Sequence, residues 1–355
     1  MEVRATTTSE VRRVAFYDDP LFRQHDPGPG HPEKADRVDA VAEAGERLQA
    51  RLLFRKPRPA TREELLRVHD AAYLDQVAAT AGRVVRLDPD TQTSARSHEV
   101  ALLAAGAVVD AVDRVLAGEI DRAFCCVRPP GHHAERDRAM GFCLYNSVAV
   151  AAAHALARGL KRVLVIDFDV HHGNGTQHIF EKDPRVLYLS SHAFPFYPGT
   201  GALDEIGEGK GRGYTVNFPL PSGCGDAEYA RVYRELAVPV GRAFDPELLI
   251  VSAGYDPGAG DPISPMNVTA NGFAEVARAC LATADGAAKG RAIFALEGGY
   301  HLQNLEEGTL ASLHALLDDP PAVPVPRAPD DPSFDRLLAA YRKALAPHWP
   351  TLATR

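Results

Sequence analysis

Residues 163–177 read VLVIDFDVHHGNGTQ. An apolar run gives way, between Asp167 and His172, to two aspartates and two histidines, and then to glycine and asparagine. A short apolar run of this kind is typical of a fully buried strand in a parallel sheet. Charge placed directly at the end of such a strand indicates either a turn with local hydrogen bonds or a metal site. The rest of the chain decides between the two.

Five further apolar runs resemble buried strands, and helical patterns lie between them. With the opening run at 162–170, the strand candidates span residues 14–19, 123–127, 186–190, 247–254 and 292–299. The helix candidates span residues 61–81, 98–118, 147–160, 226–244, 271–289 and 332–346. The first of these helices opens with a capping box of Thr61 and Glu64. The alternation predicts an α/β fold with a mainly parallel central sheet flanked by helices.

Strand signals continue to about residue 299, without a repeat or a clear boundary. We therefore expect a single domain over residues 1–355, with its core at about 14–315. The proline-rich stretch at 320–331 predicts a surface connector to a last helix at 332–346.

Composition excludes several classes of protein. The 355 residues are 45% hydrophobic and carry a formal net charge of −8, so no nucleic-acid partner is indicated. The start, MEVRATTTSEVRR, lacks the apolar stretch of a signal peptide, and no run is long enough to predict a membrane span. The five cysteines form no CxxC pair, which is typical of buried thiols in a reducing compartment. A cytoplasmic location is expected.

Polar side chains gather after the strand candidates. In open α/β sheets the ligand site lies beyond the carboxyl ends of the strands, which meet at one edge. The residues that follow the runs are His132 and His133; Asp167, Asp169, His171 and His172; His192; Tyr255, Asp256 and Asp261; and Tyr300 and His301. Any one of these could be chance, but their convergence predicts a site.

A metal is the first ligand to consider at this edge. Asp169 and His171 are two positions apart at a strand end, so their side chains point to the same side. Asp256, from another strand end, would complete three ligands and leave positions open, as in catalytic zinc sites. Iron(II) or manganese also suits oxygen-rich ligands. An isolated Asp-x-His pair is more often a turn, but the neighbouring segments favour a metal.

Two histidines and one tyrosine would supply the remaining chemistry. His132 and His133 follow Pro-Pro-Gly, and imidazole transfers protons near neutral pH. Asp167 and Asn174 are available to orient their second nitrogens. Tyr300, in LEGGYHL, could donate a hydrogen bond to an oxyanion, although this motif alone is equally compatible with packing at a turn. His172 receives no chemical role.

Together these segments resemble the zinc-dependent histone deacetylase family, including bacterial acetylpolyamine amidohydrolases. The matching motifs include HDPGPGHPEKADRV (25–38), RPPGHHAERDRAMGFC (128–143), VIDFDVHHGNGTQ (165–177), VSAGYDPGAGDP (251–262) and LEGGY (296–300). They cover about residues 14–315 in family order. The resemblance implies a single arginase-like α/β domain. The asparagine at position 174 is similar to class II sequences, whereas many class I members have an aspartate at that position.

The resemblance also implies roles for individual residues. Asp169, His171 and Asp256 would bind zinc, with iron(II) or another divalent ion as an alternative. His133 would be the general base and acid, with His132 as its electrostatic partner. The remaining catalytic residues would be Asp167, paired with His132; Asn174, which leaves His133 less strongly polarised than an aspartate would; and Tyr300, the oxyanion donor.

Substrate and potassium contacts are implied in the same way. The acyl-lysine tunnel would be lined by Gly141 and Phe142, with Tyr197 as the opposite wall, Ile263 at the rim and Asp90 near the substrate backbone. Structural potassium would lie at two sites. Their ligands would be Asp167, Asp169, His171, Ser190 and Ser191 at the first, and Phe180, Asp183, Val186 and Tyr214 at the second.

We therefore expect a zinc-dependent amidohydrolase that removes acetyl or other acyl groups from lysine side chains or related amines, giving acetate and a free amine. Acetylpolyamines or small acylated metabolites are alternative substrates. A polyamine enzyme needs acids at the rim, for which Glu135, Asp137 and Asp90 are candidates, although solvated surface acids are common. A two-manganese ureohydrolase and a non-catalytic acyl-ligand binding protein stay open. The oligomeric state, with a homodimer or homotetramer as the possibilities, and the role of segment 18–36 also stay open.

Overall fold

One sheet of parallel strands runs through the middle of the molecule. The computed structural model describes residues 12–323 and 331–353, and within them eight strands pair in the order β2-β1-β5-β10-β9-β6-β7-β8. All neighbours are parallel. The strands are β1 (Val14–Tyr17), β2 (Leu52–Arg55), β5 (Arg122–Cys125), β6 (Val163–Asp167), β7 (Val186–Ala193), β8 (Thr215–Leu220), β9 (Leu248–Ala253) and β10 (Ala292–Leu296). The predicted α/β class with a parallel sheet is confirmed.

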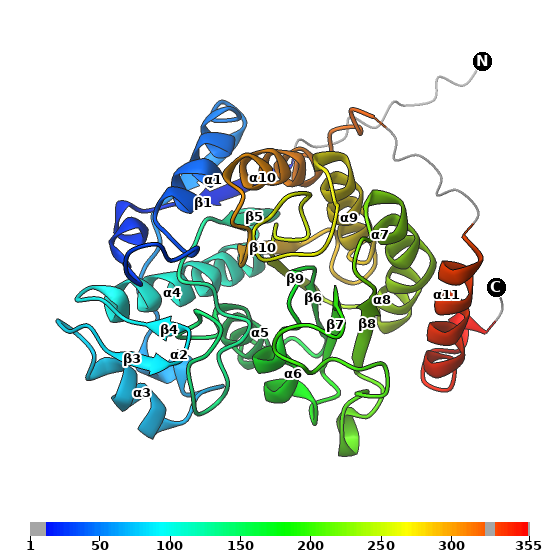
Figure 1. The fold of residues 1–355 in the computed structure, drawn as a ribbon, viewed down its shortest axis with the longest axis horizontal. Helices are drawn as coiled ribbons and strands as arrows, with labels where there is room; N and C mark the ends of the chain where they lie inside the picture. The colour runs from blue at the N-terminus through cyan, green and yellow to red at the C-terminus, as the bar shows by residue number, and fades with distance from the viewer. Residues whose placement is uncertain (1–11, 324–330, 354–355) are drawn as a thin grey trace.

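Helices cover both faces of this sheet (Figure 1). One layer contains α1 (Asp36–Glu46), α7 (Asp226–Val232), α8 (Val238–Phe244), α9 (Ala270–Ala282) and α10 (Leu302–Leu316). The other contains α4 (Ser97–Leu116), α5 (Ser147–Ala157) and α6 (Asn174–Phe180). Because both faces are covered, every residue of β6 is buried, which explains why the strand reads as an unbroken apolar run.

Smaller elements lie around this core. The helices α2 (Arg62–Leu65) and α3 (Ala71–Ala78) and the antiparallel hairpin of β3 (Arg86–Asp88) and β4 (Thr91–Gln92) form one corner of the molecule (Figure 1). A short 3-10 helix, η1, spans Pro20–Gln24. Helix α11 (Pro332–Leu345) packs beside β8, where the Tyr341 hydroxyl donates to the carbonyl of Pro219. Most of the predicted connector at 320–331 lies outside the described residues.

Several predicted boundaries were wrong. The capping box of Thr61 and Glu64 is present, but it opens only α2, and a turn separates α2 from α3 where one helix was expected over 61–81. The helix expected over 226–244 contains a π-helical turn at Tyr233–Ala237. Helix α9 ends at Ala282, before the expected residue 289. Strands β2 and β8 and helices α1, α6 and α10 were not among the predicted elements.

The strand order explains why distant segments meet. Strands β5, β10, β9 and β6 are consecutive neighbours in the centre of the sheet. The loops that leave their carboxyl ends therefore lie together, as expected for a parallel sheet. These are the loops that carry the two histidines of RPPGHH, the tyrosine of LEGGY, the aspartate of SAGYD and the Asp-x-His pair.

A buried ion cluster attaches the segment at 18–36 to this edge. The Glu33 carboxylate accepts from Arg128 at 2.7 and 2.8 Å and from Arg37 at 2.9 Å, and all three side chains are fully buried. Arg128 also donates to the carbonyls of Phe22 and His25. Burial opposes the charge of Glu33, but Arg128, His25 and Arg37 outweigh it and lower its pKa to about 2. The segment thus anchors the strand end that leads to His132.

Replacing Glu33 by glutamine should destabilise the fold, because two buried guanidinium groups would lose their counter-charge. We expect a loss of about 3–5 kcal/mol at neutral pH, measured by chemical denaturation. The pKa of Glu33 is depressed from 4.5 to about 2, so this stabilisation is present above pH 4.5 and is lost as the pH falls towards 2. The exposed control Glu43→Gln should change little; an equal effect of both variants would contradict the role of the cluster.

Candidate active site

Three buried side chains form a compact group at the centre of the strand edge. The ligating atoms of Asp169, His171 and Asp256 lie within 4.8 Å of one another. His171 Nδ1 is 3.1 Å from a carboxylate oxygen of Asp169 and 3.1 Å from one of Asp256. The three residues that the sequence analysis names as metal ligands therefore lie together, and metal binding by them stays a prediction.

The backbone holds the two carboxylates in place. Asp169 accepts from the amide of Gly298 at 2.8 Å, and Asp256 accepts from the amide of Val170 at 2.9 Å. A Cβ atom on Gly298 would stand 2.3 Å from Asp256 Oδ2 and 2.6 Å from Asp169 Oδ2. Glycine is required there, since any side chain would collide with both carboxylates. The first glycine of LEGGY, Gly298, thus lets the backbone approach the ligand group directly.

The chemistry of this group fits a divalent cation. Burial opposes a charge on His171, but the carboxylates of Asp169 and Asp256 raise its pKa to about 9. Burial raises the pKa of Asp256 to about 7, with the Asp169 charge adding to the effect. Without a cation, two buried carboxylates are thus compensated by a proton on the imidazole. A cation bound by two oxygens and one nitrogen would replace that proton.

His132 and His133 stand beside this group with different partners. His132 Nδ1 is 3.0 Å from Asp167 Oδ2, which also accepts from the Tyr188 hydroxyl. Burial opposes a charge on His132, but Asp167 and Asp169 raise its pKa well above the ordinary value. Its backbone amide donates to the buried Glu297. His132 is therefore suited to carry a positive charge.

His133 has a neutral partner instead. Its Nδ1 lies 2.7 Å from Asn174 Oδ1, which can only accept, so Nδ1 carries the proton and Nε2 keeps its lone pair. Burial, followed by the charges of His132 and His171, lowers the pKa of His133 well below the ordinary value. The pKa values of the two adjacent histidines are thus shifted in opposite directions: carboxylates raise that of His132, whereas burial and neighbouring positive charge lower that of His133.

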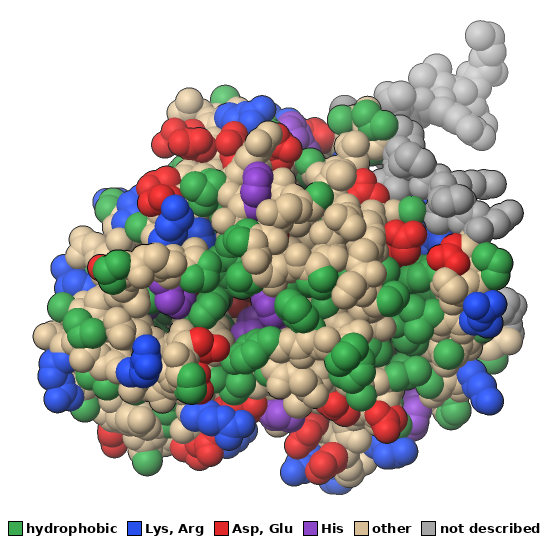
Figure 2. Space-filling view, in the orientation of Figure 1, with side chains coloured by type: hydrophobic (Ala, Val, Ile, Leu, Met, Phe, Trp, Pro, Cys, Tyr) green, Lys and Arg blue, Asp and Glu red, His purple; other side chains and the backbone are tan. Residues whose placement is uncertain are grey.

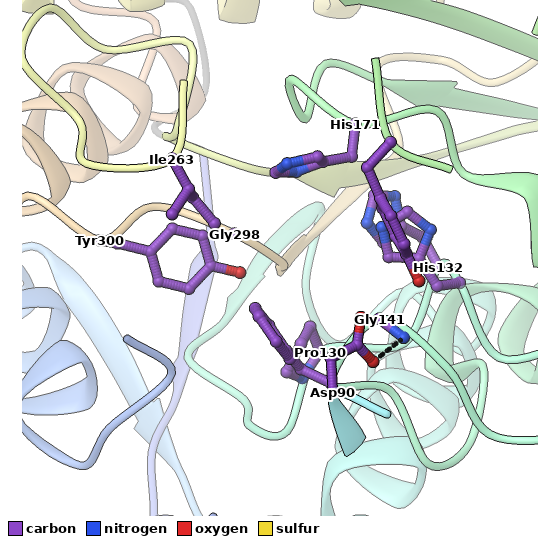
Figure 3. A pocket seen from close by; sticks show the side chains of 11 residues that line it. Asp90, Pro130, His132, Gly141, His171, Ile263, Gly298 and Tyr300 are labelled. Atoms are coloured by element: carbon purple, nitrogen blue, oxygen red, sulfur yellow. Dashed lines mark hydrogen bonds between the residues drawn. The ribbon is translucent and has the colours of Figure 1, made fainter. Parts of the chain in front are cut away.

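A cavity of about 200 Å³ opens above these residues. Figure 2 shows histidine side chains at the floor of a hollow on this face, with apolar side chains around it. The five residues predicted to line the tunnel all line this cavity, namely Asp90, Gly141, Phe142, Tyr197 and Ile263. In Figure 3 the Tyr300 hydroxyl points into the cavity, towards the side where His132 lies. Pro130 and Gly298, which were not predicted, also contribute to the lining.

Hydrogen bonds from the β3–β4 hairpin hold one wall of the cavity. Asp90 Oδ1 accepts from the amide of Gly141 at 3.0 Å, as drawn in Figure 3, and Thr91 Oγ1 accepts from the amide of Phe142 at 3.0 Å. Gly141 has φ +56°, and a Cβ there would stand 2.3 Å from the His133 ring. Asp90 therefore builds the wall as well as lining it.

Tyr300 is held by residues that the motif did not reveal. The Arg37 guanidinium lies 4.8 Å from the centre of the Tyr300 ring, and its Nε donates to the Gly299 carbonyl at 2.6 Å. Asp261 accepts from the amides of Tyr300 and His301. A similar unpredicted contact supports the ligand group: the Phe196 ring stacks on the His171 ring, with 5.4 Å between ring centres. Pattern reasoning could not find these contacts, because each joins segments far apart in the chain.

The remaining predicted residues lie farther from the cavity. His172 bonds to Thr200 and Gln177, and His192 to Ser190 and the Gly201 carbonyl, so both have structural partners. The Tyr255 hydroxyl donates to Ser312.

The residues named for potassium fall into two local groups. Asp167 and Ser190 are register partners on β6 and β7, and Ser191 Oγ is 2.9 Å from the Tyr233 hydroxyl. In the second group, the Phe180 carbonyl accepts from Asp183 and the Tyr214 carbonyl accepts from Tyr188. Val186 donates to the Asp183 carbonyl. Potassium binding at either group stays a prediction.

Comparison with known proteins places these observations in a family. Residues 31–316 match the family model described as the histone deacetylase domain. The chain is 39% identical to a probable deacetylase of Archaeoglobus fulgidus over 82% of each protein. It is 38% identical to histone deacetylase 5 of Arabidopsis thaliana, over 96% of this chain and 54% of that protein. It is 40% identical to the polyamine deacetylase HDAC10 of Homo sapiens, over 89% of this chain and 48% of that protein.

The last two relatives are longer proteins, of which this chain spans about half. Among solved structures, the HDA15 HD domain superposes with a TM-score of 0.88 at 35% identity, covering 96% of both chains. The family-model match includes every strand end that carries a site residue. The chain belongs to the histone deacetylase family.

Proposed function

We propose that this chain is a metal-dependent amidohydrolase that removes acetyl or other acyl groups from lysine side chains, giving acetate and a free amine. One observation carries the proposal: a ligand group, an imidazole with a free Nε2 and a phenol meet at a single cavity. These are the parts needed to hold a cation, move a proton and bind an oxyanion.

Asp169, His171 and Asp256 would hold the metal. Zinc is our first choice because three protein ligands with open positions are typical of catalytic zinc, while iron(II) and manganese fit the same oxygen-rich set. When bound, such a cation acts as a Lewis acid on water and on the acyl carbonyl.

His133 would act as general base and then as general acid. Its Nε2 accepts a proton from the attacking water, and the same nitrogen later donates that proton to the leaving amine. His132, held charged by Asp167, would stabilise negative charge developing beside it. The Tyr300 hydroxyl would donate to the oxygen of the former carbonyl.

The rim favours an acyl-lysine over an acylated polyamine. A polyamine carries a second ammonium group, which needs a free carboxylate near the mouth. Glu135 is buried, and Asp90 already accepts from the amide of Gly141. Asp137, the third candidate, is exposed, lies 3.8 Å from the Arg138 guanidinium and does not line the cavity. Ile263 adds an apolar side chain to the lining. Because one relative is named a polyamine deacetylase, acetylpolyamines and other small acylated amines remain the alternative substrates.

The other two functional classes fit less well. A two-manganese ureohydrolase needs further carboxylate and histidine ligands for its second ion. Among residues 12–323 and 331–353, one group of metal-ligating side chains was found, that of Asp169, His171 and Asp256. A purely acyl-ligand-binding protein would not need the ligand group, His133 and Tyr300 together at one cavity.

Further expectations belong to this proposal. Potassium would bind in a structural role at the two groups named above. Within the described residues, no helix is long and apolar enough to cross a membrane. All five cysteines are free and buried, which supports a reducing cytoplasmic compartment. No nucleic-acid partner is expected from the net charge of −8.

Replacing Tyr300 by phenylalanine should leave metal binding intact and remove most turnover. The ring, and with it the packing against Arg37, is kept, while the oxyanion loses one donor at a cost of about 2.7–4 kcal/mol of barrier, or 10²–10³-fold in kcat. Turnover should be measured on acetyl-lysine peptides, acetylputrescine, acetylspermidine and longer acyl-lysines. Near-normal kcat in Tyr300→Phe would contradict the assigned role, and a strong preference for acetylpolyamines would reverse our choice of substrate.

Replacing Asp256 by asparagine should weaken metal binding by at least roughly 10–100-fold, the loss typical of disturbing a metal's hydrogen-bonded surroundings. Metal content per chain and titration with a chelator would measure it. Asp137→Asn, the same change at an exposed position, should keep one divalent ion per chain. Two divalent ions per chain in the unaltered protein would favour the ureohydrolase class.

Metal affinity should rise with pH. The pKa of His171 is raised to about 9 in the metal-free protein, so below that pH a cation must displace a proton. Apparent affinity should then increase by about tenfold per pH unit for each proton released, between pH 6 and 8. Competition titrations at several pH values, with proton release followed by a dye, would check this. A pH-independent affinity would mean that the proton is not held at the ligand group.

A further inference from the structure

Glu135 is a buried acid whose part in the site is still unexplained. It follows the two histidines in GHHAE and was considered above as a rim acid that meets a substrate amine. Instead, only 5% of it is exposed, and its carboxylate lies against α6, which also carries Asn174, the partner of His133. Its Oε1 accepts from Asn174 Nδ2 at 2.7 Å and from His178 Nδ1 at 2.8 Å.

These contacts set the orientation of the Asn174 amide. An asparagine side chain has a donor end and an acceptor end, and a carboxylate can only accept. Because the Nδ2 end of Asn174 faces Glu135, its Oδ1 end must face His133 Nδ1. That end accepts, so the proton of the neutral His133 imidazole is held on Nδ1. The lone pair is then left on Nε2.

We propose that Glu135 is a positioning residue that sets the tautomer of His133 through the side-chain amide of Asn174. The inference rests on the proposed role of His133 as a base. Without Glu135, the amide could rotate and offer its donor end to His133 Nδ1. The proton would then reside on Nε2, where the base needs a lone pair.

Glu135 is itself held firmly. Its carbonyl accepts from His69 Nδ1 at 2.9 Å, while His69 Nε2 accepts from the amide of Asn146 at 3.0 Å. Its amide donates to the Arg138 carbonyl at 3.0 Å. Asn174 and His178 are one turn apart on α6, so both donors reach the same carboxylate oxygen from one side of the helix.

Additional contacts favour the same orientation of the amide. Asn174 Nδ2 is 3.3 Å from the Met140 sulfur and 3.5 Å from the His133 carbonyl, both of which are acceptors. A donor end surrounded by three acceptors has little reason to exchange with the acceptor end. The carboxylate is the strongest of the three, since a charged acceptor forms roughly twice as strong a hydrogen bond as a neutral one.

The test compares Glu135→Gln with Glu135→Met in the zinc-loaded protein. Glutamine keeps an acceptor for Asn174, whereas methionine has similar size and offers only a weak one. We expect kcat of Glu135→Gln to stay within about threefold of the parent value. In Glu135→Met, kcat should fall by roughly tenfold or more, which is part of the 10²–10⁴-fold that a general base contributes. KM and metal content should be unchanged in both variants. Glu43→Gln, a change at an exposed position of α1 away from the cavity, is the control and should match the parent protein.

A direct readout follows the tautomer itself. In protein labelled with ¹⁵N in its histidines, the His133 ring signals, assigned with a His133→Ala variant, should report a proton on Nδ1 in the parent and in Glu135→Gln. In Glu135→Met, the Nε2-protonated form should gain population. This measurement needs no substrate, so it tests the inference even if no acyl-amine is turned over and the proposed function fails.

A double-mutant cycle separates action through Asn174 from a general loss of stability. If Glu135 acts through the amide, Glu135→Met should have no further effect on kcat or on the tautomer in an Asn174→Ala background. Independent, additive effects would overturn the inference. So would equal kcat in Glu135→Gln and Glu135→Met, or an Nδ1 proton retained in the methionine variant.

Discussion

The burial of charge at the end of a parallel sheet is the constraint on which this structure depends. Asp167, Asp169 and Asp256 are all essentially fully buried at neighbouring strand ends. A buried carboxylate costs several kcal/mol unless it is paired and hydrogen-bonded. Backbone amides and the imidazoles of His132 and His171 together satisfy that requirement. The glycines of this edge exist because the backbone must come within hydrogen-bonding distance of the carboxylates.

The same constraint separates the two adjacent histidines. His132 faces the carboxylate of Asp167, which favours the charged imidazole, while His133 faces the amide of Asn174, which adds no charge. Two neighbouring imidazoles with ring centres 4.0 Å apart repel each other if both are charged. The acid beside His132 thus favours a charge there, while burial and the neighbouring positive charges keep His133 neutral, as a base requires.

The sequence predicted the fold class and the converging residues because both depend on local patterns. Continuous apolar runs indicate strands buried on both faces, and parallel strands bring their ends together. The misplaced boundaries also have local causes. The range 61–81 was read as one helix because its apolar residues continue, yet the chain turns at Asp70, whose amide bonds to the distant Arg136 carbonyl.

What could not be predicted depends on contacts between segments that are far apart. Arg37 reaches Tyr300 across more than two hundred residues, and nothing near either residue indicates the pair. From the sequence, Glu135 was a candidate for an exposed acid at the rim, because a glutamate in a charged stretch is usually exposed. Its burial follows from the donors on α6, a helix that was not among the predicted elements. Two donors are aimed at one oxygen of this buried acid, so its contacts in the fold indicate its role better than its neighbours in sequence do. Through Asn174, these contacts connect Glu135 to His133, the histidine whose proton must stay on Nδ1.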